Sequence, residues 1–305
     1  MLEILGKTSI DFMGKRRWAF LFSGIMVVLG IVAIIQIGRG SANLGIDFAG
    51  GTAVQLKFDQ AIRIDEARKV LEANGLGNAE LQEFGQDNKL LIRLKASTTI
   101  EEKVADRVVA VFTKEFASNH FVVDSSTEIG PTIGKKLQDD ALIAILISFA
   151  GIILYVAARF EFRFGIAAAL ATFHDVLAVL GAFYILDKEI TLLVVTALLT
   201  LAGYSMTDTV VVFDRIRENL RMRRRESEST IINNAVNQVL SRTIVTSLTV
   251  VLVLIPLTVA GGEVLHDFSL ALLWGVIFGT YSSVFVASPL LLLWPGASGR
   301  LLKGN

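Results

Sequence analysis

Long runs of apolar residues, separated by short charged segments, are the main pattern in this 305-residue chain. A helix needs about 20 consecutive apolar residues to cross the hydrocarbon core of a membrane. Six runs come close to that length. The predicted transmembrane helices are residues 18–38, 141–158, 164–186, 191–213, 242–259 and 270–293. The pattern therefore predicts an α-helical, multi-pass membrane protein.

The segment between the first and second apolar runs has a different pattern. Charged residues are frequent there, and no run is long enough to span a membrane. Period-2 alternation predicts strands, and an apolar stripe at helical spacing predicts helices. The expected elements are strands at 53–58, 81–84, 90–94 and 121–123, and helices at 64–74 and 104–116. Their order, βαββαβ, predicts a ferredoxin-like α+β domain.

These patterns divide the chain into four predicted parts. The parts are residues 1–38 (cytoplasmic N-terminus and first transmembrane helix), 39–135 (periplasmic ferredoxin-like domain), 136–295 (transmembrane helices two to six, with a cytoplasmic loop at 214–241) and 296–305 (cytoplasmic tail).

Charge placement predicts the orientation. Lys and Arg concentrate in segments that lie on the cytoplasmic side if the N-terminus is cytoplasmic, as the positive-inside rule requires. The short turns 187–189 and 261–267 carry an acidic excess instead. We therefore expect both termini in the cytoplasm and residues 39–135 in the periplasm. The cluster at 221–225 is interpreted as the orienting signal itself, with contact to anionic lipids or the ribosome as the alternative.

Composition excludes several classes of function. The chain has no cysteine, so disulfides, thiol catalysis and cysteine metal sites are excluded. The formal net charge is zero, which gives no general attraction to nucleic acid. There is no nucleotide-binding loop, nucleophile triad or metal-ligand cluster, so we expect no enzyme activity, no metal site and no cofactor.

Asp208 is the residue on which the functional prediction depends, because it lies inside an apolar run. An unpaired charge at that depth costs roughly 2.5–3.5 kcal/mol on insertion scales. Arg242, at the start of the next run, could pair with it, and Thr246 lies one turn further along the same helical face. The alternatives are a static structural pair, and an Arg242 side chain that extends to the cytoplasmic surface.

The third apolar run contains His174 and Asp175. Neighbouring residues point about 100° apart on a helix, so we expect only one of them to face a given partner. Asp175 could support a proton path or fix the packing of helices, and the sequence leaves both interpretations open.

Two further groups of polar and small residues flank the predicted helices. Gly45, Asp47, Gly50 and Gly51 join the first span to the first strand, where glycines permit either a hinge or a tight turn. Asp214, Arg215 and Arg217 follow the fourth span. We expect them to fix an amphipathic helix in the cytoplasmic loop, with contact to a partner as the alternative.

Several segments in this order resemble the SecD/SecF family of the RND superfamily, and in particular its SecF members. The segments that carry the resemblance are 45–52 (GIDFAGGT), 159–163 (RFEFR) followed by His174-Asp175, 203–219 (GYSMTDTVVVFDRIREN) and 241–247 (SRTIVTS). Together they cover nearly the whole chain, and their order is highly specific.

The resemblance implies an accessory subunit of the bacterial Sec preprotein translocase in the cytoplasmic (inner) membrane. It implies that protons are the coupling ion and that the family's proton-path Asp and Arg correspond to Asp208 and Arg242, with support for Thr246. It also implies that SecD, the SecYEG translocon, translocating preproteins and membrane lipids are the partners. The alternatives are an RND-type transporter half for a small molecule or lipid, and a passive assembly subunit.

Overall fold

The computed structural model describes residues 8–84, 88–95, 104–222 and 226–293. The chain forms two compact units. The helical unit comprises residues 1–43, 145–188 and 193–305, and the sheet unit comprises residues 44–144 and 189–192. The sheet unit thus includes a short connection that lies far along the chain from its strands. The predicted tail at 296–305 lies outside the described residues.

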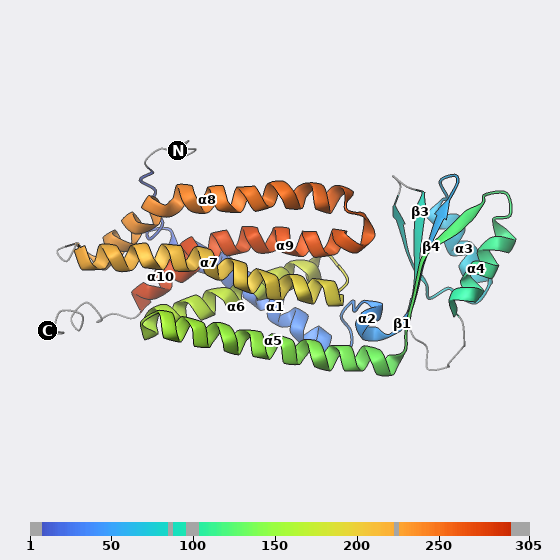
Figure 1. Cartoon of the computed structure of the whole chain (residues 1–305), viewed down its shortest axis with the longest axis horizontal. Coiled ribbons are helices and arrows are strands. Elements are labelled where there is room, and N and C mark those ends of the chain that lie inside the picture. Colours follow the sequence, from blue (N-terminus) through green and yellow to red (C-terminus); the bar gives the residue numbers. More distant parts are fainter. Residues whose placement is uncertain (1–7, 85–87, 96–103, 223–225, 294–305) are drawn as a thin grey trace. The chain divides into compact units, whose positions relative to one another are not determined.

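In the described part of the chain, six helices are long and apolar enough to cross a membrane, as predicted. They are α1 (Arg16–Gly38), α5 (Pro131–Arg159), α6 (Phe162–Ile185), α7 (Leu192–Met222), α8 (Glu228–Ala260) and the segment Leu265–Leu293 (Figure 1). The last of these combines α9 (Gly262–Ser282), a π-helical turn (Ser283–Ala287), α10 (Ser288–Leu290) and a 3-10 turn (Leu291–Leu293).

The predicted cytoplasmic loop at 214–241 is largely helical. Helix α7 continues to Met222, and α8 begins at Glu228. The Ser227 hydroxyl caps α8 by accepting a hydrogen bond from the Thr230 N–H at 3.2 Å, as N-cap serines do. The polar residues of this region therefore extend two membrane helices. Residues 223–225 lie outside the described residues.

The sheet unit contains β1 (Gly51–Phe58), β2 (Glu80–Phe84), β3 (Lys89–Lys95) and β4 (Phe121–Ile129), with helices α2 (Ile46–Ala49), α3 (Ile64–Ala73) and α4 (Val104–Glu115). The strand order is β2-β3-β1-β4, and all neighbouring strands are antiparallel. Helices α3 and α4 cover one face of the sheet (Figure 1). With the crossovers through α3 and α4, this is the split βαβ arrangement predicted from the sequence.

Successive side chains along β1 point to opposite faces of the sheet, which explains which face is buried. Val54, Leu56 and Phe58 point to the same face and are at most 2% exposed. They pack with Leu71 of α3 and Phe112 of α4. A strand with every second residue buried and a helix with one apolar stripe can bury these surfaces only against each other.

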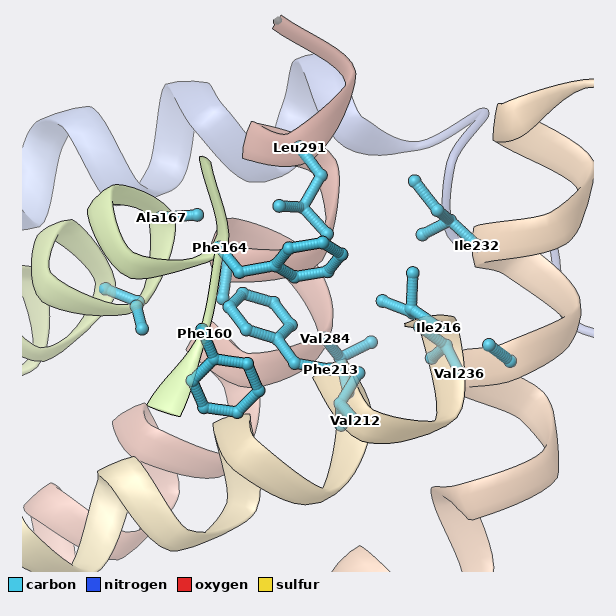
Figure 2. Packing of buried hydrophobic residues seen from close by; sticks show 14 of the residues in the cluster. Phe160, Phe164, Ala167, Val212, Phe213, Ile216, Ile232, Val236, Val284 and Leu291 are labelled. Carbon is cyan, nitrogen blue, oxygen red and sulfur yellow. The ribbon is translucent and has the colours of Figure 1, made fainter. Parts of the chain in front are cut away.

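Aromatic residues join α6 to α7 in the core of the helical unit (Figure 2). The ring of Phe213 lies 5.3 Å from that of Phe164 and 6.1 Å from that of Phe160, in edge-to-face geometry. Ile232 and Val236 of α8 belong to the same cluster. Such aromatic pairs prefer edge-to-face contact, so this cluster fixes α7 against its neighbours at one end of the bundle.

Helices α1 and α6 cross at two glycines. A Cβ atom added to Gly181 would lie 2.9 Å from the backbone nitrogen of Gly30, and one added to Gly30 would overlap Leu177. Small residues allow membrane helices to approach closely, where packing rather than the hydrophobic effect drives association. Gly30 and Gly181 therefore set the distance between these two helices.

The segment before α1 is bound to α8 through its backbone. The Asn233 side-chain oxygen accepts hydrogen bonds from the N–H groups of Phe12 (2.8 Å) and Met13 (3.2 Å). The Asn237 side chain accepts from the Ile10 N–H at 2.9 Å and donates to the Ile10 carbonyl at 2.9 Å. Phe12 and Met13 are buried in the core cluster. Two asparagines one helical turn apart thus hold the segment before α1, including its turn at Phe12 and Met13, against α8.

Candidate functional site

Asp208 lies at a junction of three helices in the helical unit. Its side chain projects from α7, and the residue is 7% exposed. The carboxylate accepts a hydrogen bond of 3.4 Å from the Ser247 hydroxyl of α8. Ser247 in turn lies 2.6 Å from the Thr280 hydroxyl of α9. Asp208 is therefore buried, as predicted, and a hydroxyl chain links it to both neighbouring helices.

Arg242 is exposed. Among the described residues, no ion pair within 4.0 Å joins it to Asp208. Thr246 is exposed too, and its hydroxyl donates to the carbonyls of Arg242 (3.1 Å) and Thr243 (2.9 Å). Of the α8 side chains, the Ser247 hydroxyl thus donates to the Asp208 carboxylate, and Arg242 stays a predicted partner.

Asp175 forms a second cluster, and it is completely buried. Its carboxylate is hydrogen-bonded to the ring Nδ1 of His174 at 2.9 Å and accepts from Ser282 of α9 at 2.8 Å and from Ser205 of α7. We expected His174 and Asp175 to face different partners. The two side chains also contact each other, and Asp175 is the one that bonds to hydroxyls of α7 and α9.

The two carboxylates lie against the same pair of helices. Ser205 and Asp208 are one turn apart on α7 and so share a face. On α9, Ser282 contacts Asp175 and Thr280 contacts Ser247. Gly279 faces Ser205 so closely that a Cβ atom would lie 3.1 Å from its side chain. Glycine at this position lets α9 approach α7 and brings the hydroxyls of both helices within hydrogen-bonding range.

Other buried polar atoms surround these carboxylates. In the described part of the chain, the buried side-chain atoms without a hydrogen-bond partner include Nε2 of His174, Oγ1 of Thr209 and Oγ1 of Thr243. Buried polar groups are nearly always hydrogen-bonded in proteins, to protein or to water. Polar atoms that could still form hydrogen bonds, to water for example, therefore lie on α6, α7 and α8 near the carboxylates.

The glycine-rich segment predicted to be a hinge or a turn contains the short helix α2 and a turn. Gly50 has φ +71° and Gly51 has φ +143°, a region that favours glycine. The Asp47 carboxylate accepts a hydrogen bond from the Leu192 N–H at 3.0 Å. The Gly45 N–H donates to the Ile190 carbonyl at 3.1 Å. This segment thus holds residues 189–192 within the sheet unit.

Glu189 belongs to the same part of the sheet unit. Its carboxylate lies 3.0 Å from Arg93 of β3, and its side chain is 8% exposed. Burial raises the pKa of Glu189, and nearby Glu80 raises it further, whereas Arg93 and Lys95 act in the opposite direction. The sequence did not single out Glu189 because it reads as one acidic residue in a short turn.

At the other end of α7, the predicted loop residues form contacts of their own. Asp214 pairs with Arg159 at 2.8 Å. Arg215 pairs with Glu218 at 2.6 Å and donates to Gln238 of α8, also at 2.6 Å. The Nε atom of Arg217 is buried without a hydrogen-bond partner among the described residues. Asp214 and Arg215 thus tie α7 to α5 and α8.

The part of the chain that the structure describes contains no group of three or more His, Cys, Asp or Glu residues that could hold a metal ion. The groups that the structure brings together at the site are carboxyl, imidazole and hydroxyl groups. These groups bind, hold and pass protons.

Sequence reasoning missed three of the hydroxyl residues. Ser247, Thr280 and Ser282 contact the two carboxylates or their partners. Membrane helices contain many serines and threonines that bond only to their own backbone, so the hydroxyls near a carboxylate do not stand out.

Comparison with known proteins gives a consistent result over nearly the whole chain. The family described as "Protein export membrane protein SecD/SecF, C-terminal" matches residues 108–296, and the "SecD/SecF GG Motif" matches residues 43–62. A "Protein translocase subunit SecF" from Thermodesulfovibrio yellowstonii is 52% identical and covers 96% of this chain and 97% of the relative. One of the same description from Magnetococcus marinus is 43% identical, with 98% and 96% coverage.

A solved structure agrees with these relatives. The crystal structure of SecDF from Thermus thermophilus, described as a translocon-associated membrane protein, matches with a TM-score of 0.83 and 34% identity. The match covers 96% of this chain but 39% of the SecDF chain. The present chain therefore corresponds to a minor part of that longer protein.

Proposed function

The chain belongs to the SecD/SecF family of protein export membrane proteins, and we propose that it is a proton-driven accessory subunit of the Sec preprotein translocase. In this proposal it uses the proton motive force, through Asp208 and Arg242, to promote a late stage of translocation on the periplasmic side. The observation that carries the proposal is a buried carboxylate, Asp208, whose bound hydroxyl connects three membrane helices.

Asp208 would bind and release the coupling proton. A charged carboxylate in an apolar bundle is costly, so protonation changes which neighbours it favours. The ionised form attracts Arg242, which stays charged at any relevant pH. The protonated form does not, and the Ser247 hydroxyl then suffices as its partner. Proton binding would therefore alter how α7 packs against α8.

The energy available per proton is modest. One charge that crosses about 100 mV of membrane potential releases about 2.3 kcal/mol. That is enough to shift an equilibrium between two packing arrangements by almost two orders of magnitude. Thr246, and the hydroxyls of Thr209 and Thr243, are the groups along which water would bring protons to Asp208. Asp175, with His174, either supports this path or fixes the helices around it.

The relatives support the proposal about partners. The SecDF structure carries in one longer chain the region that matches this protein. We propose that the present chain packs against SecD and acts beside the SecYEG translocon on emerging preproteins. Its location would be the inner membrane of a bacterium, with both termini in the cytoplasm and the sheet unit in the periplasm. The Lys and Arg distribution supports this orientation.

The decisive experiment measures preprotein export in membrane vesicles that contain the chain together with SecD and SecYEG. We expect Asp208→Asn to abolish the stimulation of export by an imposed proton gradient, with the complex still assembled. The exposed Asp65 lies in the sheet unit, so Asp65→Asn is the matched control and should behave as the wild type.

The alternatives predict other results. A passive assembly subunit would give the same gradient-stimulated export with Asp208→Asn as with wild type. A transporter half for a small molecule or lipid would give proton-coupled solute flux without any preprotein present. Either outcome contradicts the proposal.

A further inference from the structure

The first residue of α7 is held by the sheet unit. Residues 189–192 belong to that unit, whereas the rest of α7 from residue 193 belongs to the helical unit. The Leu192 N–H donates to the Asp47 carboxylate at 3.0 Å. The first N–H groups of a helix have no partner inside the helix. Asp47 thus caps α7 from a position 145 residues earlier in the chain.

Two further contacts hold the same short segment. Leu44 and Ile190 form a parallel β-bridge, and the Gly45 N–H donates to the Ile190 carbonyl at 3.1 Å. A Cβ atom at residue 45 would lie 2.8 Å from the Thr191 methyl group, so glycine permits this approach. Residues 189–192 are thus held by backbone hydrogen bonds, by the Asp47 side chain and by the close fit of Gly45 against Thr191.

A further contact is the ion pair between Arg93 and Glu189. Arg93 pairs with Glu189 at 3.0 Å, and both side chains are largely buried, at 17% and 8% exposed. Arg93 lies on β3, in the middle of the sheet. An ion pair shielded from solvent is screened less by salt than an exposed one. The pair therefore attaches the start of the 189–192 segment to the rigid part of the sheet unit.

We infer that Gly45, Asp47 and Arg93 are positioning residues for α7, which they make move with the sheet unit. The inference rests on the proposed function, because α7 carries Asp208. Helix α7 is continuous from Leu192 to Met222. At 1.5 Å per residue, the sixteen residues from Leu192 to Asp208 correspond to about 24 Å. A displacement of the first turn is therefore transmitted along an unbroken helix to the proton site.

Coupling of this kind works in both directions. If the position of α7 alters how Asp208 meets Ser247, then proton binding at Asp208 must alter the favoured position of residues 189–192 by the same free energy. The contacts between residues 189–192 and the rest of the sheet unit must stay formed throughout the proton cycle. If they broke, a displacement of the sheet unit would no longer move α7. That requirement makes the inference testable.

A disulfide tests whether the attachment stays closed. The Cβ position at residue 45 lies 3.5 Å from the Thr191 Cβ, within the range of about 3.5–4.5 Å found in disulfides. The chain has no cysteine of its own. We expect the double variant Gly45→Cys/Thr191→Cys to form the bond on oxidation and to keep its gradient-driven export, with the reduced form as control. Export that stops on oxidation and returns on reduction would overturn the inference.

A second pair of variants loosens the attachment. Asp47→Ala removes the cap, whereas Asp47→Asn keeps a side-chain oxygen that can accept from Leu192. Since a cap is worth about 0.5–2 kcal/mol, we expect Asp47→Ala to lower gradient-driven export about two- to thirtyfold. Asp47→Asn should lie near wild type. Equal export by both variants would contradict a positioning role.

An infrared titration of Asp208 separates this inference from the proposed function. The carboxyl band of Asp208, identified by its loss in Asp208→Asn, should titrate at a different pH in Asp47→Ala than in Asp47→Asn. An unchanged titration in the assembled complex overturns the inference. If Asp208→Asn exports normally while Asp47→Ala shifts the titration, the proposed function fails and the mechanical link between Asp47 and Asp208 stands.

Discussion

The Ser205 hydroxyl on α7 donates a hydrogen bond to the Asp175 carboxylate on α6. Ser205 lies one turn before Asp208 on the same helix, so α7 contributes to both buried carboxyl clusters. A shift of α7 along its axis would disturb the Asp175 contacts and the Asp208 contacts together. The two clusters are therefore parts of one helix-packing arrangement.

The contacts of Asp175 give a first prediction about stability. Asp175→Leu leaves the donors of Ser205, Ser282 and His174 without their acceptor. An unsatisfied buried donor costs about 1–3 kcal/mol, so we expect a large drop in the thermal unfolding temperature in detergent. Ser205→Ala removes a single hydrogen bond and should cost about 1 kcal/mol. Equal unfolding temperatures for the two variants would contradict this ordering.

The hydroxyl partner of Asp208 gives a second prediction. Ser247→Ala removes the donor to Asp208 and the contact with Thr280. One hydrogen bond of about 1 kcal/mol corresponds to about a fivefold change in an equilibrium constant. We therefore expect gradient-driven export to fall about fivefold. Thr249→Ala, whose hydroxyl only donates to the Thr246 carbonyl on the exposed face, is the control and should export normally.

Glu189 gives a prediction about pH. Burial raises the pKa of this carboxyl above its usual 4.5 in the folded protein. Between pH 4.5 and the raised value, the folded state holds more protons than the unfolded state, so stability falls as pH rises through that window. We expect hydrogen exchange of residues 189–192 in the full chain to become faster, relative to the intrinsic rate, as pH rises through it.

Substitution checks the origin of this pH dependence. Glu189→Gln cannot titrate, so the extra acceleration should disappear. Glu66→Gln changes an exposed residue of the same unit and should leave it intact. A pH dependence that survives in Glu189→Gln would assign the effect to another group.

The crossing of α1 and α6 gives a prediction about packing. A side chain at Gly30 would overlap Leu177, whereas Gly24 on the same helix has open space around it. Overpacking costs about 1–3 kcal/mol, so Gly30→Ala should unfold at a lower temperature than the wild type in detergent. Gly24→Ala should unfold no earlier than wild type, because alanine favours helix over glycine. If both variants unfolded earlier than the wild type, the cause would be a general sensitivity of α1 to substitution and not the contact between Gly30 and Leu177.

Much of the fold follows from local pattern. The six membrane helices could be predicted because a bilayer requires long apolar runs. The βαββαβ order could be predicted because apolar residues recur with a period of 2 in strands and 3.6 in helices, and these periods are easily distinguished. Helix ends were less predictable. Polar residues from 214 onward suggested a loop, yet no residue there breaks a helix, and α7 continues to Met222.

The candidate site was predictable only in part. Asp208 and Asp175 stand out because a carboxylate in an apolar run is rare. Their partners do not, since Ser247 and Ser282 resemble every other hydroxyl in a membrane helix. The interaction of Asp47 with Leu192 was also invisible, because the two residues are brought together only by the tertiary fold. Arg242 remains a predicted partner of Asp208.

The asparagines that hold the segment before α1 have a consequence for biosynthesis. Phe12 and Met13 are synthesised more than 200 positions before Asn233 and Asn237. At about 5–20 residues per second, that interval lasts about 10–45 s. The segment before α1 can therefore reach its final place only after α8 has been made, and until then its apolar side chains must be kept from water by other contacts.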